Sequence, residues 1–499
     1  MPKKPSRKEQ SLDQWLWDAA DILRGPVDKA DFKAYIFPLL FLKRLSDVYD
    51  EEYEAALALS DFDEEFAQLP EQHRFQIPPG AHWRDVREAH SDVGEAIKRA
   101  MREIERANPV NLSQVFGDVN WTNKARVPDS LLRDLVEHFS SKILTTSQVP
   151  NDMLGDAYEF LIKKFADKTR KKAGEFFTPR RVVELMINIL DPEPGETIYD
   201  PACGSGGMLI EAVKHVREEG GDPRLLFGKV FGQEKNVNTS AIAKMNLILH
   251  GMEDFSIATG DTLREPAFVQ RDHLMTFDCV IANPPFSLEK WGDELWENDR
   301  WGRNTAGTPP TSNGDWAWLQ HMLASMTPGT GRVAVVLPLG ALFRGGTEGR
   351  IRSQVLASDL FEAVIELGPN LFYGATIPAC IVVARAHKPT ERRQKVLFID
   401  ASDLFQKGRN QNTLEDVHVE KIFELYTKFS DVERYARLVD LDDVIAQGGD
   451  MSVGKFVTKH VAEELPSKDE ALAQLQKAYQ AVEESEQRVL ALLRDRGLL

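Results

Sequence analysis

Apolar residues recur every three or four positions over most of the first 150 residues, which is the spacing of a helix that buries one face. Ser11 and Asp31 stand where helix N-caps are expected. Because the two-residue alternation of a strand does not appear before about residue 195, we predict a helical N-terminal domain over residues 1–150. Its expected helices are 11–25, 31–58, 92–107 and 128–141.

Short apolar runs alternate with helix-like runs farther along the chain. The seven candidate strands are 196–200, 229–234, 256–261, 277–283, 332–338, 362–367 and 379–385. Strand–helix alternation is typical of a parallel sheet with helices on both faces. We therefore predict an α/β fold, with a Rossmann-like domain over residues 151–410 built on a mostly parallel, seven-stranded sheet. Ligands bind beyond the carboxyl ends of the strands in such sheets.

The pattern becomes helical again toward residue 499. Residues 466–496 form one long charged segment with an apolar stripe, which predicts a single helix. We therefore expect a C-terminal helical region over 411–499, whose stripe is a reasonable docking surface for a partner. The stripe consists of Leu472, Leu475, Ala478, Val482, Val489 and Leu493.

The composition, 42% apolar and 28% charged residues, is normal for a soluble globular protein of two or three domains. The longest apolar stretch, 34–42, is too short to cross a bilayer, and the basic first ten residues lack the apolar segment of a signal peptide. Cys203, Cys279 and Cys380 do not have the spacing of a metal site. We expect a cytoplasmic protein with reduced thiols, no metal and no membrane contact.

The formal net charge is −17, whereas a protein that holds DNA alone usually presents a basic face. We therefore expect a partner to supply much of any phosphate binding. Basic residues do gather just before residue 178, where they could contact phosphates or could equally be a solvated surface. They include Lys168, Arg170, Lys171 and Lys172.

A glycine-rich turn follows the first candidate strand, at 198–212. Gly204, Gly206 and Gly207 allow a sharp turn and a close approach of the backbone to a ligand. The N–H groups of the following helix start would then face an anionic group such as a carboxylate. Glycines alone fit a ligand-free turn about equally well.

Acidic residues end the first three candidate strands: Asp200, Glu234 and Asp261. Glu234 stands where doubly wound nucleotide sites position an acid on the ribose hydroxyls. Any one of these acids alone is better explained as a surface or turn residue. Together, at three successive carboxyl ends, they indicate a nucleotide-like cofactor.

The fourth candidate strand ends in Asn283, Pro284, Pro285 and Phe286. The side-chain oxygen of Asn283 and the carbonyl of Pro284 can each accept a hydrogen bond from an exocyclic amine, and the prolines hold both acceptors rigid. Phe286 offers a face for stacking a base. A base reaches such a pocket only when flipped out of the duplex. Adenine N6 and cytosine N4 both fit this chemistry.

The sequences Asp-Pro-Ala-Cys-Gly-Ser-Gly-Gly at 200–207 and Asn-Pro-Pro-Phe at 283–286, with Gly-Glu-Phe-Phe-Thr-Pro-Arg upstream at 174–180, resemble the S-adenosylmethionine-dependent amino-methyltransferases of DNA. With its helical N-terminal domain, the chain resembles the modification (HsdM) subunit of type I restriction–modification systems over nearly its whole length. This resemblance implies methylation of adenine N6 in DNA, with S-adenosylmethionine as the cofactor. No metal is required for this reaction.

The resemblance also implies residue roles. The segment that folds over the methionine end of the cofactor is Glu175, Phe176, Phe177, Thr178, Pro179 and Arg180. Ser205, Gly206 and Gly207 would line the cofactor, Glu234 would bind the ribose and Asp261 would lie by the adenine. Phe372 or Tyr373 would pack on the flipped base, or else be an ordinary core aromatic.

The family implies a separate specificity subunit that reads the target sequence and binds two modification subunits, possibly with a restriction or translocase subunit. Consistent with this, we find no second module after residue 400 of the size that target recognition needs. Two other functions remain open from the residues: a protein glutamine methyltransferase, and a non-catalytic assembly or methyl-sensing subunit. The loop at 287–314, with its three tryptophans, could close over a substrate or be the core of an insertion.

Overall fold

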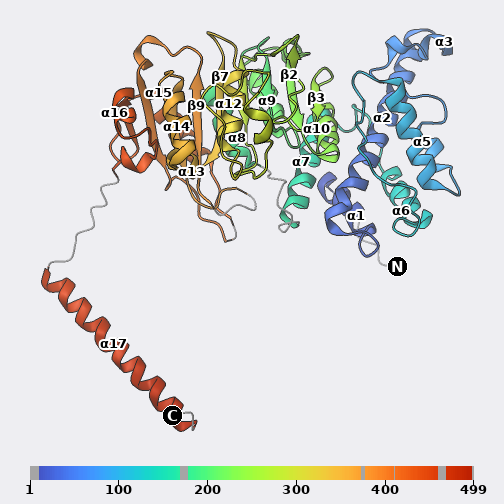
Figure 1. Ribbon diagram of the computed structural model, residues 1–499. Helices are drawn as coiled ribbons and strands as arrows, with labels where there is room; N and C mark the ends of the chain where they lie inside the picture. The colour runs from blue at the N-terminus through green and yellow to red at the C-terminus, as the bar shows by residue number, and fades with distance from the viewer. Residues whose placement is uncertain (1–10, 169–177, 373–376, 410, 459–467, 497–499) are drawn as a thin grey trace. The chain divides into compact units, whose positions relative to one another are not determined.

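A computed structural model describes residues 11–168, 178–372, 377–409, 411–458 and 468–496 (Figure 1). The chain divides into two compact units, Met1–Val457 and Thr458–Leu499. Each unit is described by itself below.

Helices make up the N-terminal part of the first unit, as predicted. They are α1 (Leu12–Ile22), α2 (Phe32–Leu59), α3 (Glu64–Ala67), α4 (Trp83–Arg87), α5 (Val93–Ala107), α6 (Asp129–Ser140) and α7 (Asn151–Lys168). The Ser11 hydroxyl accepts a hydrogen bond from the Gln14 N–H and so caps α1, as expected. Asp31 stands at the N-cap of α2, but its carboxylate forms an ion pair with Arg126 and no capping hydrogen bond.

The centre of the first unit is one sheet, in the strand order β11-β10-β8-β9-β7-β6-β1-β2-β3. Its strands are β1 (Ile198–Asp200), β2 (Val230–Glu234), β3 (Ser256–Thr259), β6 (Cys279–Ala282), β7 (Arg332–Pro338), β8 (Phe361–Leu367), β9 (Ala379–Arg385), β10 (Lys395–Ala401) and β11 (Ala436–Asp440). Most neighbours are parallel, but β9 is antiparallel to both β7 and β8, and β11 is antiparallel to β10. A short hairpin, β4 (Val269–Gln270) with β5 (His273–Leu274), stands apart from it.

The α/β fold with a mostly parallel sheet is confirmed, and all seven expected strands form. The expected count of seven is too low, because β10 and β11 extend the sheet to nine strands. β10 is buried along almost its whole length, as β7 and β9 are, but it begins at the end of the charged stretch 391–395. The expected C-terminal helical region, 411–499, contains β11 and two helices, α15 (Asp416–Lys428) and α16 (Leu441–Ala446), that belong to the first unit.

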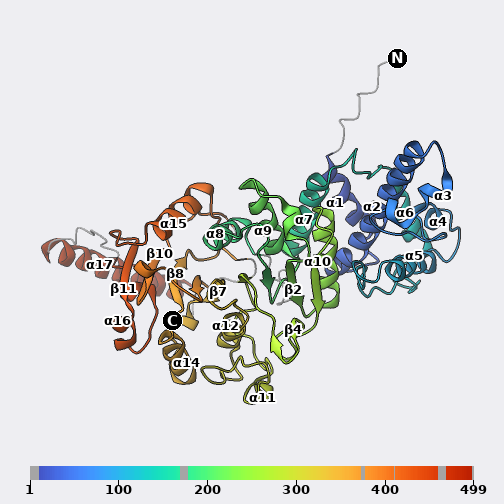
Figure 2. The same cartoon turned by 90° about the horizontal axis from the view of Figure 1, so that it is seen from above.

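Helices cover both faces of the sheet (Figure 2). On one face lie α8 (Arg180–Leu190), α9 (Gly207–Glu218), α10 (Val237–Leu249) and α15, and on the other lie α12 (Asp315–Ala324), α13 (Gly340–Phe343), α14 (Gly346–Leu356) and α16. Each layer has its own apolar core against the sheet. The sheet is therefore buried on both faces, as parallel sheets require.

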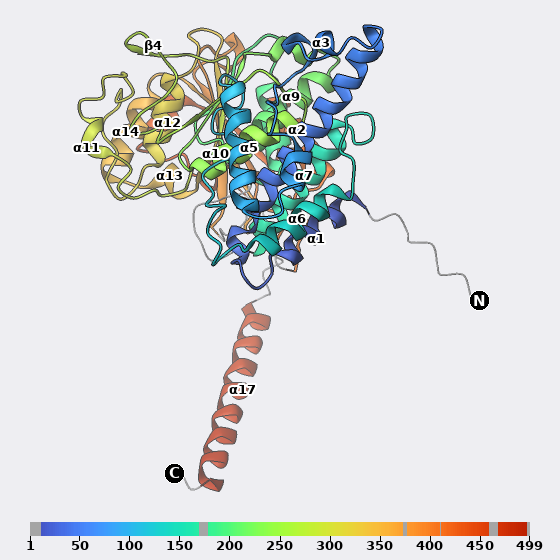
Figure 3. The ribbon, with the colours of Figure 1, turned by 90° about the vertical axis from the view of Figure 1, so that its right-hand side faces the viewer.

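Helix α10 connects the helical region to the sheet. Its residues Ala243 and Leu247 belong to the core of the sheet, whereas Ala241 and Met245 belong to the core that α1, α2, α5, α6 and α7 build. The helices α7 and α10 are in direct contact and lie next to each other in Figure 1, and Figure 3 shows the N-terminal helices α2 and α5 in front of them. One helix thus contributes to two cores.

In the described residues of the second unit there is one helix, α17 (Lys468–Asp495), which matches the expected long helix. Several residues of the expected stripe are exposed on it, including Leu472, Leu475, Val482 and Val489. Among the described residues, no helix is both long enough and apolar enough to cross a membrane.

Candidate active site

The strand order of the sheet reverses between β1 and β6. These strands are parallel neighbours, with Ile198 opposite Cys279 and Tyr199 opposite Val280. From β1 the chain continues to β2 on one side, whereas from β6 it continues to β7 on the other. This reversal is the switch point at which α/β sheets bind ligands. It brings the turn after Asp200 beside the turn after Ala282.

The turn after β1 has the backbone that its glycines allow. Gly204 has φ 54° and Gly206 has φ 80°, both in the left-handed region. A Cβ added at Gly204 or Gly207 would meet no atom within 4 Å, so the loop borders open space. Asn246 of α10 donates its side-chain N–H to the Ser205 carbonyl over 3.0 Å and holds the loop. The loop therefore leaves room for a ligand at the start of α9.

Glu234, at the end of β2, is tied to this loop. Its carboxylate accepts hydrogen bonds from the Gly204 N–H over 3.2 Å and the Asn236 N–H over 2.8 Å. Asp261 follows β3, the neighbour of β2, and forms an ion pair with Lys235 over 2.8 Å. The three successive acids thus lie at one edge of the sheet, and Glu234 is held by the glycine loop itself.

Asp200 is the most buried of these acids, with only 2% of the residue exposed. Its carboxylate accepts the Ala202 N–H over 2.9 Å, which shapes the turn. Burial raises the pKa of Asp200 to about 8, and the negative charge of Glu234 adds to the rise. Asp200 is therefore mostly protonated at neutral pH and acts as a neutral part of the turn.

Asn283 directly follows β6, and its side-chain amide is hydrogen-bonded at the nitrogen end but not at the oxygen end among the described residues. Its Nδ2 donates to the Thr178 hydroxyl over 2.8 Å. Its Oδ1 is buried and has no hydrogen-bond partner among the described residues. A buried acceptor without a donor is costly, so this oxygen is suited to a ligand that brings one.

The sequence did not predict that Thr178 orients Asn283, because the two residues are 105 positions apart. It also missed Asp315 at the start of α12. The buried carboxylate of Asp315 accepts the Ser287 N–H over 2.7 Å and pairs with Arg344. This contact fixes the chain just beyond Phe286. The one local signal is the position of Asp315 in the first turn of a helix, which is too common to mark a site.

Phe286 is half-buried and lies edge-on to Phe372, with ring centroids 6.1 Å apart and an interplanar angle of 70°. Phe372 itself is buried in the core of the sheet, which agrees with a core aromatic. Tyr373 lies outside the described residues. Pro284 is buried and Pro285 half-buried between Asn283 and Phe286.

The segment 175–180 is described only in its second half. Pro179 is the N-cap residue of α8, and Arg180 pairs with Glu184 of α8 over 3.2 Å and with Glu211 of α9 over 3.3 Å. Thr178 and Arg180 therefore connect this segment to Asn283 and to the helix that follows the glycine loop. Glu175, Phe176 and Phe177 lie outside the described residues, as do Arg170, Lys171 and Lys172 from the basic cluster.

Of the two interpretations of the 287–314 loop, the structure favours packing for two of its tryptophans. Trp291 and Trp296, on either side of the start of α11 (Asp293–Trp296), are buried with ring centroids 5.1 Å apart. Arg303 stacks on Trp296 and forms a buried ion pair with Asp299 over 2.6 Å. Trp301 is half-buried and lies against Arg300.

Comparison with known proteins agrees with this geometry. The N-6 DNA Methylase family model matches residues 149–465, and the HsdM N-terminal domain model matches residues 12–139. The MjaVII type I restriction enzyme methylase subunit of Methanocaldococcus jannaschii is 33% identical over 91% of this chain and 78% of its own length. The MpnII type I restriction enzyme methylase subunit of Mycoplasma pneumoniae is 28% identical over 93% of this chain and 92% of its own length.

A solved structure gives the same result. The crystal structure of the type I restriction–modification methyltransferase subunit from Streptococcus thermophilus superposes with a TM-score of 0.75 at 31% identity, over 89% of this chain and 99% of that one. The family models and these relatives cover both the helical region and the sheet. The chain therefore belongs to the N-6 DNA methylase family, as a modification (HsdM) subunit of the type I restriction–modification class.

Proposed function

We propose that Asn283 and Pro284 hold the N6 amine of a flipped-out adenine while a methyl group is transferred to it from S-adenosylmethionine bound at the glycine loop. The observation that carries this proposal is the buried Oδ1 of Asn283 at the switch point of the sheet, which has no hydrogen-bond partner within the part of the chain that the structure describes. Because Thr178 occupies the donor end of the amide, the acceptor end is the one available to the base.

The two acceptors of this proposal, Oδ1 of Asn283 and the carbonyl oxygen of Pro284, change the reactivity of the amine; together they are called the clamp. The N6 lone pair of adenine is delocalised into the ring, so it is a weak nucleophile. When Oδ1 of Asn283 and the carbonyl oxygen of Pro284 each accept one N–H, the nitrogen is favoured in the pyramidal form, whose lone pair can attack. Pro284 and Pro285 keep the acceptors in place, which lowers the cost of reaching that geometry. Phe286 stacks on the base and replaces part of the stacking lost on flipping.

The residues around the glycine loop fit the cofactor. When bound, S-adenosylmethionine supplies an activated methyl group on a sulfonium, which leaves as a neutral thioether. Gly204 and Gly207 border open space, so the backbone can approach a ligand there. The carboxylate of Glu234 is oriented by the Gly204 and Asn236 N–H groups, and in this proposal it accepts the ribose hydroxyls. The remaining cofactor contacts in the proposal are Glu175, Phe176, Phe177, Thr178, Pro179, Arg180, Asp200, Ser205, Gly206 and Asp261.

The wider assembly is also part of the proposal. With a net charge of −17, this subunit depends on a partner for much of its phosphate binding. That partner is a specificity subunit, which reads the target and binds two modification subunits, alone or with a restriction subunit. The exposed apolar residues of α17, on the C-terminal side of residue 457, form the docking surface for it. The helical domain, proposed as 1–150, and the sheet domain, proposed to begin at 151 and to extend beyond 410 through β11 to Val457, support the site.

The test uses the subunit purified with its specificity partner. Labelled S-adenosylmethionine is supplied with host DNA or host protein, and the modified base is identified by mapping. We expect N6-methyladenine in DNA, and Asn283→Ala should abolish it while cofactor binding by calorimetry is retained. Label on protein would support the glutamine methyltransferase alternative. Label on cytosine would show that the target amine is cytosine N4. Unchanged DNA methylation by Asn283→Ala would refute the clamp.

A further inference from the structure

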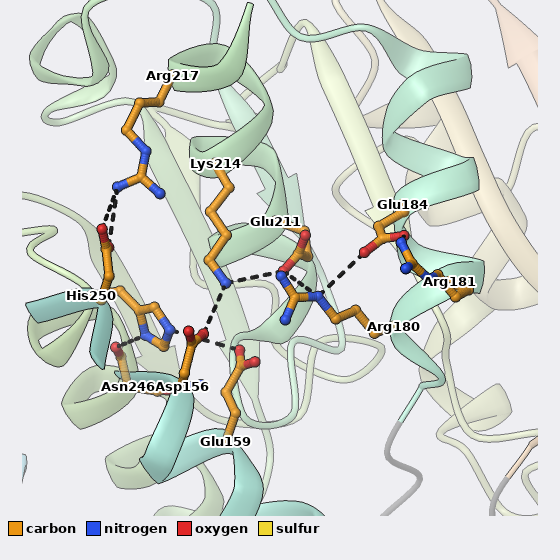
Figure 4. Close-up of polar contacts among 11 residues, drawn as sticks. Asp156, Glu159, Arg180, Arg181, Glu184, Glu211, Lys214, Arg217, Asn246 and His250 are labelled. Atoms are coloured by element: carbon orange, nitrogen blue, oxygen red, sulfur yellow. Dashed lines mark hydrogen bonds and ion pairs between the residues drawn. The ribbon is translucent and has the colours of Figure 1, made fainter. Parts of the chain in front are cut away.

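Three side chains that the methyl-transfer site does not use converge between α7 and α10. They are Asp156 and Glu159 of α7 and His250 at the end of α10 (Figure 4). Each offers one ligand atom, and these atoms all lie within 4.8 Å of one another. The shortest recorded separation is 4.0 Å, between His250 Nε2 and Glu159 Oε1.

The tautomer of His250 follows from its backbone contact. Its Nδ1 lies 2.9 Å from the Asn246 carbonyl oxygen, which can only accept, so Nδ1 carries the proton. In this tautomer Nε2 carries the lone pair.

That lone pair has no donor. The His250 side chain is only 5% exposed, and its Nε2 has no hydrogen-bond partner among the described residues. It points toward the carboxylates of Glu159 and Asp156 (Figure 4). Three acceptors that face one another repel, and burial strengthens the repulsion. A cation between them removes this conflict.

The chain is shaped to bring the ring this close. A Cβ at Gly155 would lie 2.5 Å from His250 Nε2, so any side chain there would push the imidazole away from α7. Gly155 directly precedes Asp156, and the glycine therefore allows the ligand atoms to meet. The position is helical, where glycine otherwise costs stability.

The neighbouring cations do not fill the gap. Lys214 Nζ lies 3.3 Å from Glu211 and 3.7 Å from Asp156, and no contact with Glu159 or His250 is recorded for it within the described part of the chain. Arg180 pairs with Glu184 and Glu211 (Figure 4). The Lys214 ammonium repels a cation bound at Asp156 and so lowers the affinity of such a site.

We propose that Asp156, Glu159 and His250 bind one divalent transition-metal ion, which joins α7 to α10. One imidazole nitrogen with two carboxylate oxygens suits Zn²⁺ better than Ca²⁺ or Mg²⁺, which prefer oxygen ligands alone. Donation from Nδ1–H to a backbone carbonyl is the usual support for a metal-binding histidine. Asp156, whose side chain is 60% exposed, has the freedom to close the remaining distance. No cysteine takes part, so cysteine spacing could not reveal this site.

The experiment uses the full-length chain, stripped with chelator and titrated with Zn²⁺ alone in a calorimeter, with bound metal counted by mass spectrometry. We expect one tight site per chain. Asp156→Asn and Glu159→Gln, which keep the side-chain volume, should each weaken binding about tenfold or more. Asp152→Asn is the matched control, because Asp152 lies on the same helix, is equally exposed and pairs with Arg217 instead. It should change the affinity less than about twofold.

Lys214→Met provides a test with the opposite sign. Removing the ammonium 3.7 Å from Asp156 should tighten Zn²⁺ binding, whereas general damage to the fold would weaken it. Zn²⁺ should also raise the melting temperature of the wild-type chain and not that of Glu159→Gln. The proposal is overturned if the wild-type chain takes up no Zn²⁺, or if both carboxamide variants bind it as the wild type does.

Discussion

At the scale of single residues, the amide of Asn283 shows how a side chain is given one orientation. Its two ends are nearly identical in shape, so packing alone does not choose between them. In the structure the Thr178 hydroxyl accepts from the Nδ2 end, which leaves Oδ1 without a donor among the described residues. The substrate amine can then meet only an acceptor.

Replacing Thr178 tests this orientation. Thr178→Val keeps the shape but removes the acceptor, so the amide can rotate and present N–H groups to the substrate amine. We expect kcat to fall about tenfold to a hundredfold, which corresponds to about 1.4–2.7 kcal/mol. Thr178→Ser keeps the hydroxyl and should stay within a few fold of wild type. Equal rate constants of methyl transfer for the two variants in single-turnover assays would contradict the orienting role.

The protonation of Asp200 makes the free energy of unfolding depend on pH. The folded state holds a proton on this carboxyl up to about pH 8, whereas an unfolded aspartate ionises near pH 4. Between these values the folded state binds more protons, so the free energy of unfolding falls as pH rises, by up to about 1.4 kcal/mol per unit. Asp200→Asn should remove this slope while still accepting the Ala202 N–H. Urea unfolding at about pH 5 and about pH 8 measures it, and parallel changes in both proteins would refute it.

At the scale of elements, apolar runs were enough to predict seven strands, and turn residues were enough to predict where ligands bind. Gly204 and Asn283 both follow strands whose interior is apolar, and parallel neighbours bring those ends together. β10 and β11 were missed for local reasons. β10 begins at the end of the charged stretch 391–395, whereas β11 is a half-exposed edge strand with charged residues at two of its five positions. Contacts between distant residues, such as Thr178 with Asn283, leave no periodic trace in the sequence.

Arg332, the first residue of β7, joins three elements. Its guanidinium donates to the Leu190 and Asp191 carbonyls at the end of α8 and to both oxygens of Glu196, which precedes β1. This single side chain therefore satisfies helix-end carbonyls and a carboxylate together. It fixes α8, which begins beside Thr178, against the sheet.

Loss of this guanidinium should destabilise the first unit. Arg332→Met removes the charged partner of Glu196 and the donors that Arg332 gives to the helix-end carbonyls, in a largely buried setting, at a cost of about 2–4 kcal/mol. Arg437→Met is the control, because its pair with Asp431 is exposed on both sides and should cost less than about 1 kcal/mol. Chemical denaturation of both variants gives the comparison. Similar losses would show that the Arg332 contacts do not stabilise the fold.

At the scale of the whole molecule, the two compact units differ in kind. The first unit holds the sheet, its helices and the candidate site, whereas the second holds α17 with apolar residues exposed along it. A helix that exposes such residues gains stability when a partner covers them. The sequence predicted this helix because an apolar stripe at helical spacing needs no distant contacts to be recognised.

Removing the second unit should separate assembly from folding. A chain that ends at Val457 keeps all of the first unit, so its melting temperature should match that of the full chain. In our proposal it no longer co-purifies with the specificity subunit. Val482→Glu should have the same effect, whereas Glu483→Gln on the same helix should not. Assembly of the shortened chain with its partner, by gel filtration, would rule out α17 as the docking element.

The shared helix α10 has a consequence for building chimaeras. The two family models meet between residues 139 and 149, which suggests a natural place to exchange the helical region between relatives. The apolar packing does not end there, since Ala241, Ile242 and Met245 face that region from inside the sheet domain. The apolar side chains of a helical region grafted at the junction would have to pack against an α10 that comes from a different protein. Exchanges should therefore carry these positions, together with Ile248 and Leu249 of the same core, with the graft, far from the splice point.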